Sequence, residues 1–110
     1  MDTLTTVFPG PDEFVIVEKP AIPINLTEFK LELGNPTEAK RLEVSGKVIL
    51  KVLVNERGNY VRHIVLKDPH AALTTAVESK IRQLRYAPAV HGSKAVPYWI
   101  TLPFDFVMIK

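Results

Sequence analysis

The side chains that could bind a metal or perform catalysis are three histidines, the serines and twelve carboxylates. The histidines, His63, His70 and His91, do not fall at a metal-ligand spacing such as H-x-x-x-H. The five glycines contain no G-x-G pair of a phosphate-binding loop, and no serine lies in a G-x-S-x-G nucleophile elbow. The chain has no cysteine, which excludes disulfides, thiolate metal sites and a cysteine nucleophile. We therefore expect no catalytic residue, no metal site and no cofactor, and we do not interpret the chain as an enzyme.

The last stretch of the chain offers a different chemistry, that of main-chain hydrogen bonds. Apolar residues alternate with other residues from Val96 to Phe106, a pattern that predicts a strand. Pro97 and Pro103 fall within it, and proline cannot donate a ladder hydrogen bond, so the strand should lie at a sheet edge. Because the two prolines are six residues apart, their missing donors point to the same, unpaired side. The other main-chain groups predicted to face that side belong to Trp99, Thr101 and Asp105.

Two interpretations of this edge follow from the residues. An extended peptide can add itself as a further strand along it, or the prolines only prevent unwanted edge pairing. Trp99, the only tryptophan, also has two interpretations, since it either anchors a partner or covers the outer face of the sheet.

The rest of the chain predicts the elements that position this strand. A β-rich run at residues 14–17 predicts a short strand, and Asn25 with Glu28 three residues later predicts a capped helix start. Asn35-Pro36 begins a second predicted helix, with proline at its first position. The remaining predicted elements are strands at 47–54 and 60–67 around a turn at 55–59, a helix at 72–84, and a final strand at about 95–107.

This order of elements predicts an α+β fold. We expect a small antiparallel three-stranded sheet, with a short N-terminal strand as an optional addition, and helices packed on one face. The 110 residues fit one domain, with residues 1–13 as a flexible lead-in and residues 14–110 as the folded part.

Charge and hydropathy exclude further classes of function. The net charge is only +2 and the basic residues are scattered, so we expect no nucleic-acid partner. No apolar run approaches the roughly 18–20 residues that span a bilayer. No segment has the pattern of a signal peptide. The chain as given is therefore expected to be soluble, and these features alone leave a cytosolic location open.

Several short segments, taken in order, carry a recognisable signature. Upstream are Pro36-Thr37-Glu38-Ala39-Lys40 and Gly46-Lys47-Val48, with Gly58 in the hairpin turn. Downstream are Arg85-Tyr86-Ala87-Pro88-Ala89, then Gly92, Lys94, Val96 and Pro97, then Leu102-Pro103-Phe104-Asp105-Phe106. In this order and spacing they resemble the C-terminal domains of TonB proteins, over about residues 14–107.

The resemblance implies a protein-binding domain of an energy transducer. TonB-type domains work in the periplasm on an inner-membrane anchor and grip the N-terminal TonB box of an outer-membrane transporter, which binds as an added strand. A proton-motive-force complex of the inner membrane is then a further partner of a full-length protein. Family members often have Tyr-Pro where this chain has Asn35-Pro36, a pair associated with receptor contact. The resemblance thus implies partner binding at Asn35, Pro36, Pro97, Trp99, Thr101, Pro103 and Asp105.

Three alternatives stay open beside this one. A free-standing adaptor of the same fold would bind extended peptides without energy transduction. An enzyme or ligand-binding domain on the same scaffold would need a pocket with a titratable pair. A homodimer would form if two unpaired edges joined.

Overall fold

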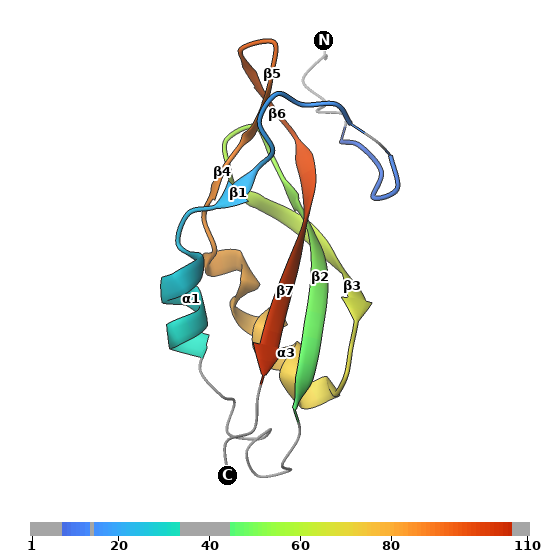
Figure 1. Cartoon of the computed structure of the whole chain (residues 1–110), viewed down its shortest axis with the longest axis vertical. Helices are drawn as coiled ribbons and strands as arrows, with labels where there is room; N and C mark the ends of the chain where they lie inside the picture. The colour runs from blue at the N-terminus through green and yellow to red at the C-terminus, as the bar shows by residue number, and fades with distance from the viewer. Residues whose placement is uncertain (1–7, 14, 34–44, 107–110) are drawn as a thin grey trace.

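The central element is a three-stranded antiparallel sheet in the order β3-β2-β7 (Figure 1). The computed structural model describes residues 8–13, 15–33 and 45–106. The sheet consists of β2 (Gly46–Val54), β3 (Tyr60–Lys67) and β7 (Tyr98–Phe106). The predicted strands at 47–54 and 60–67 are therefore confirmed.

A tight turn sets the register of the β2–β3 hairpin. The Asn55 Oδ1 atom accepts hydrogen bonds from the main-chain N–H groups of Arg57 and Asn59, each at 2.9 Å. Gly58 has a φ of 79°, in the left-handed region that favours glycine. A side chain at Gly58 would also collide with the main-chain carbonyl of Tyr86. The hairpin therefore requires glycine at this position.

Two helices of the described part of the chain pack on one face of the sheet. They are α1 (Leu26–Leu33) and α3 (Ala71–Lys80), and a 3-10 turn at Ile81–Gln83 continues α3. The predicted helix at 72–84 is thus confirmed, with its last turn wound more tightly. The core joins this face of β2 and β7 to the helices, and its most buried side chains are Val48, Leu50, Val52, Val54, Leu73, Val77, Ile81 and Phe104.

The described residues also form two short ladders, one beside the upper part of the sheet and one above it (Figure 1). β1 (Ile22–Pro23) pairs with β4 (Tyr86–Ala87), and β5 (Ala89–His91) pairs with β6 (Lys94–Val96). Gly92 and Ser93 form the turn of the second ladder, with φ angles of 58° and 67°. The α+β fold class, with an antiparallel sheet and packed helices, is confirmed.

Two local predictions need correction, and a third is upheld. The strand predicted at 14–17 is wrong for Val15–Val17, which lie outside any strand, and the N-terminal strand is β1 instead. The final strand begins at Tyr98 and not near residue 95, because Lys94–Val96 belongs to the β5–β6 ladder. Asn25 does precede α1, since its carbonyl accepts the Phe29 N–H at 3.0 Å.

The Asn25 side chain serves a purpose that its predicted capping role did not include. Its Oδ1 atom accepts the Arg85 N–H at 2.8 Å, and its Nδ2 atom donates to the Gln83 carbonyl at 3.3 Å. The start of α1 is thereby joined to the chain that leaves α3. Among the residues described, no helix is long and apolar enough to span a membrane. The second predicted helix, at Asn35-Pro36, lies outside the described residues.

Candidate functional site

β7 forms one edge of the sheet, and its pairing is more regular than that of β3 on the opposite edge. β7 pairs with β2 without a break, from Phe106 opposite Gly46 to Tyr98 opposite Val54. β3 has two register shifts against β2, which leave Val61 and Leu66 without a partner residue. Such bulges twist and blunt an edge. β7 therefore offers the better template for a further strand.

The position of Pro103 indicates which main-chain groups of β7 point away from β2. Pro103 lies opposite Ile49 in the unbroken register. Since proline has no N–H, this pair fits the ladder as a non-hydrogen-bonded pair, and alternation gives every second residue the same orientation. The residues of this parity are Trp99, Thr101, Pro103 and Asp105. In the described part of the chain, no backbone hydrogen bond reaches β7 from outside the sheet. We call this side of β7 the outer edge.

Pro97 does not belong to β7, contrary to the sequence prediction. It lies between β6 and β7, where the chain leaves one ladder and enters the other. Its lack of an N–H and its fixed φ suit this junction. Pro97 therefore marks the start of the outer edge, and Pro103 is the proline within it.

The Trp99 side chain covers the outer face of the sheet, which was one of its two interpretations. It is 8% exposed, and its Nε1 atom donates to the Pro9 carbonyl at 2.6 Å. The Arg62 guanidinium lies 5.3 Å from its ring centroid. Only the main chain of Trp99 is therefore available for pairing, because its ring is already occupied within the domain.

Residues near the N-terminus lie against this outer face, a contact that the sequence analysis did not predict. The Lys51 Nζ atom donates to the Pro11 carbonyl, beside the Trp99–Pro9 hydrogen bond. The sequence did contain one signal for such a cover. Leu53 alternates onto the outer face of β2, where an apolar side chain needs burial, and the structure shows it 0% exposed. A hollow of about 240 Å³ remains, lined by Pro11, Glu13, Val15, Lys51, Tyr98, Trp99 and Thr101.

The remaining predicted residues of β7 are exposed. Thr101, Pro103 and Asp105 alternate with the buried residues of the core face. The Lys47 Nζ atom lies 3.8 Å from Asp105 Oδ1, with both side chains about half exposed or more. Such an exposed ion pair contributes little to stability. The described residues thus bring Trp99, Thr101, Pro103 and Asp105 together on one strand, while Asn35 and Pro36 lie outside the description.

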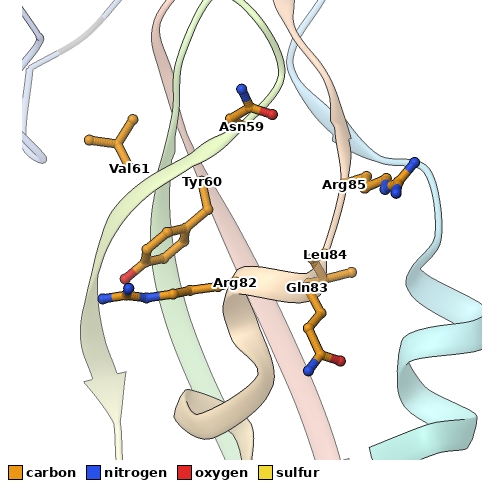
Figure 2. Close-up of a pocket in the computed structure, with 7 residues that line it drawn as sticks. All are labelled: Asn59, Tyr60, Val61, Arg82, Gln83, Leu84 and Arg85. Carbon is orange, nitrogen blue, oxygen red and sulfur yellow. The ribbon is translucent and has the colours of Figure 1, made fainter.

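A separate polar hollow of about 590 Å³ lies between the start of β3 and the segment Arg82–Arg85, at and after the 3-10 turn. Figure 2 shows the Arg82 side chain along the Tyr60 ring and the Arg85 side chain pointing away from both. The Arg82 guanidinium is 5.6 Å from the Tyr60 ring centroid. The Tyr60 hydroxyl hydrogen-bonds to His63 Nδ1 at 2.7 Å, and His63 Nε2 to Glu78 at 2.6 Å.

This hydrogen-bonded chain joins β3 to α3, since His63 is on the strand and Glu78 on the helix. The described residues hold no group of three or more potential metal ligands. Burial, with a smaller contribution from Tyr60, raises the pKa of Tyr86. The buried Tyr86 hydroxyl has no hydrogen-bond partner among the described residues, and we assign it no chemistry.

Comparison with known proteins gives one family and one fold. The family model described as "Gram-negative bacterial TonB protein C-terminal" matches residues 35–108. The solution NMR structure of the Pseudomonas aeruginosa TonB CTD is similar in fold, with a TM-score of 0.57 and 21% sequence identity. This match covers 82% of the present chain and 88% of the Pseudomonas chain. No curated protein matches the sequence.

Proposed function

Because this chain belongs to the TonB C-terminal domain family of Gram-negative bacteria, a transport-related and non-enzymatic family of the periplasm, we propose that it binds a transporter peptide along β7. The peptide is the N-terminal TonB box of an outer-membrane transporter. The domain acts within a TonB-like energy transducer that is anchored in the inner membrane and driven by a proton-motive-force complex. The protein thereby supports energised uptake across the outer membrane.

The outer edge of β7 is the observation that supports this proposal most strongly. Its register with β2 is unbroken over nine residue pairs, and no described residue outside the sheet makes a backbone hydrogen bond to it. An added strand can use the main-chain groups of Trp99, Thr101 and Asp105 together with the Pro103 carbonyl. Strand addition of this kind draws its affinity mainly from such main-chain hydrogen bonds.

The side chains along the edge are consistent with a peptide partner. Thr101, Pro103 and Asp105 are exposed, so an approaching strand displaces little of the folded domain. The Trp99 ring stays with Pro9 and Arg62, and its main chain alone takes part. If the peptide orders on binding, the affinity is modest, because ordering costs conformational entropy.

Self-association is the second candidate, and the same outer edge favours it. Two copies of β7 could pair across a two-fold axis and bury the same main-chain groups. Such a dimer and a bound peptide would exclude one another. Sedimentation of the domain over a range of concentrations separates the two cases, because only self-pairing raises the mass with concentration.

The proposal is tested by an amide NMR titration with a synthetic peptide from the N-terminus of a transporter of the same organism. We expect the largest shifts at Trp99, Thr101 and Asp105 and small shifts on α3. The control is the same peptide with a central residue replaced by proline, which removes one main-chain donor and should bind more weakly. A demonstrated monomer that shows no shifts with saturating peptide would exclude transporter binding at this edge.

A further inference from the structure

A small gap opens beside the outer edge of β7, next to α1. Its volume is about 110 Å³, and it is lined by Lys30 and Leu33 of α1 and by Phe104, Asp105 and Phe106 of β7. The Asp105 side chain lies on the other face of the sheet, 3.8 Å from Lys47. Asp105 therefore borders the gap with its main chain, which belongs to the outer edge. The gap thus opens at this edge, on the face that carries the helices.

Contacts between α1 and β7 hold the wall of this gap in place. The rings of Phe29 and Phe104 lie 5.6 Å apart at an interplanar angle of 53°, an arrangement that favours aromatic contact. The Lys30 Nζ atom lies 5.9 Å from the centroid of the same Phe104 ring. Phe29 is buried and Leu33 is half-buried, whereas Leu31 is 77% exposed. α1 therefore turns its Leu33 side toward β7 and its Leu31 side toward solvent.

The geometry of an added strand brings one of its side chains to this gap. Neighbouring strands lie about 4.8 Å apart, and side chains directly opposite each other point to the same face. A peptide residue beside Phe104 therefore points to the helix face, between β7 and α1. The residues before and after it point to the outer face, near exposed Pro103 and Asp105. Only every second residue of the peptide can therefore direct its side chain toward the gap.

Resting on the proposed function, we infer that this gap is a specificity pocket for one aliphatic side chain of the bound peptide, of valine to leucine size. A cavity of roughly 150 Å³ lined by apolar side chains can hold a benzene ring, so 110 Å³ suits an aliphatic side chain and not tryptophan. Its lining is apolar at Leu33, Phe104 and Phe106 and polar at Asp105 and Lys30, although the methylene stem of Lys30 can pack against an aliphatic side chain. A basic side chain is disfavoured there, since the Lys30 ammonium borders the gap and would repel it.

This pocket gives the edge a preference that main-chain pairing lacks. Main-chain hydrogen bonds are available to every extended peptide, whereas a pocket for alternate side chains distinguishes one peptide from another. The domain is therefore expected to select transporter peptides with an aliphatic residue at one fixed position. Positions of the opposite parity remain tolerant, because they lie over the exposed outer face.

The test combines an alanine scan of the transporter peptide with two variants of α1. Against the unmodified domain, alanine at one aliphatic peptide position should weaken binding about five- to tenfold, and its neighbours should matter little. Leu33→Ala should weaken the parent peptide by a similar factor, whereas Leu31→Ala, on the exposed side of the same helix, should leave the dissociation constant unchanged. In the Leu33→Ala domain, the sensitive peptide position should lose most of its effect, which identifies the pair that interacts.

The outcomes separate this inference from the proposed function. Two results would refute the pocket while strand addition stands. In the first, the peptide shifts the amide signals of β7, but alanine at no scanned position weakens binding. In the second, Leu31→Ala and Leu33→Ala change the affinity for the peptide to the same extent. If the peptide does not bind the unmodified domain at all, the proposed function fails first. Thermal unfolding of both variants controls for folding, and the peptide scan against the unmodified domain decides the question even if Leu33→Ala does not fold.

Discussion

The orientation of the Thr101 main chain can be tested by replacing this residue with proline. Pro103 lies two residues away in the same register, so Thr101 should also direct its N–H away from β2. Thr101→Pro would then remove a donor from the outer edge and leave the β2–β7 ladder complete. The Thr101 side chain is exposed, so its replacement disturbs no core contact. The fold should survive while the proposed binding site loses one hydrogen bond.

The magnitudes follow from what each state loses. In the free domain the cost is the adjustment of a strand φ toward about −65°, which we place at about 1 kcal/mol because no ladder bond is broken. In the complex, the lost hydrogen bond contributes about 1 kcal/mol, and the peptide carbonyl left without a donor costs about as much again. Together these predict a dissociation constant raised by about 30-fold.

The assay measures peptide affinity by titration calorimetry and stability by urea unfolding for three variants. Thr101→Val keeps the main-chain donor and should bind like the parent domain. Leu102→Pro removes a donor that faces β2 and also a buried side chain, so it should lose at least about 3 kcal/mol of stability. The reasoning is refuted if Thr101→Pro unfolds as readily as Leu102→Pro, or if it folds and binds the peptide with unchanged affinity.

Three further predictions concern the stability of the domain. Gly58→Ala should lower the stability of the domain in urea unfolding by at least about 2 kcal/mol, because alanine is strained at φ 79° and its Cβ would collide with the Tyr86 carbonyl. A stability loss below roughly 0.5 kcal/mol, about the uncertainty of the assay, would contradict this prediction. Tyr86→Phe should stabilise the domain by about 1 kcal/mol near neutral pH, since a buried hydroxyl without a partner is removed. Because the pKa of Tyr86 is raised in the folded state, the unfolded state loses the tyrosine proton at lower pH than the folded state does. The stability of the parent domain should therefore fall above a pH of about 10, and the stability of Tyr86→Phe should fall less steeply. If the stability of both proteins depends on pH in the same way, the burial argument is contradicted. Trp99→Phe should remove the hydrogen bond to Pro9, lower the stability of the domain by about 1 kcal/mol and speed proteolytic cleavage within residues 8–13. An unchanged cleavage rate would show that this hydrogen bond does not hold the segment in place.

The parts of the fold that follow from local rules were predictable from the sequence. β2 and β3 are defined by apolar alternation and by a turn that needs glycine at residue 58. The helix predicted at 72–84 corresponds to α3 and the 3-10 turn that follows it. The edge position of the last strand was predicted from Pro97 and Pro103, and Pro103 is the one that lies within β7. This signal was readable because a missing donor is a property of the residue type. These patterns involve residues that are close in the sequence, so they can be recognised without knowledge of the tertiary structure.

The features that sequence reasoning missed depend on long-range contacts. The carbonyls of Pro9 and Pro11 accept hydrogen bonds from Trp99 and Lys51, and a main-chain carbonyl carries no signal of residue type. The β5–β6 ladder has only three residues in each strand, too few for alternation to separate it from the start of β7. The Asn25 side chain was expected to serve its own helix and instead joins residues near 85, sixty positions away.

Amide hydrogen exchange along β7, measured by NMR with and without the transporter peptide, tests the central claim most directly. Without peptide, the Thr101 and Asp105 amides should exchange much faster than those of Leu102 and Phe104, whose N–H groups face β2. With saturating peptide, Thr101 and Asp105 should become protected while the exchange of Leu102 and Phe104 changes little. Protection of Thr101 and Asp105 that does not respond to the peptide, in a domain that demonstrably binds it, would contradict strand addition at the outer edge.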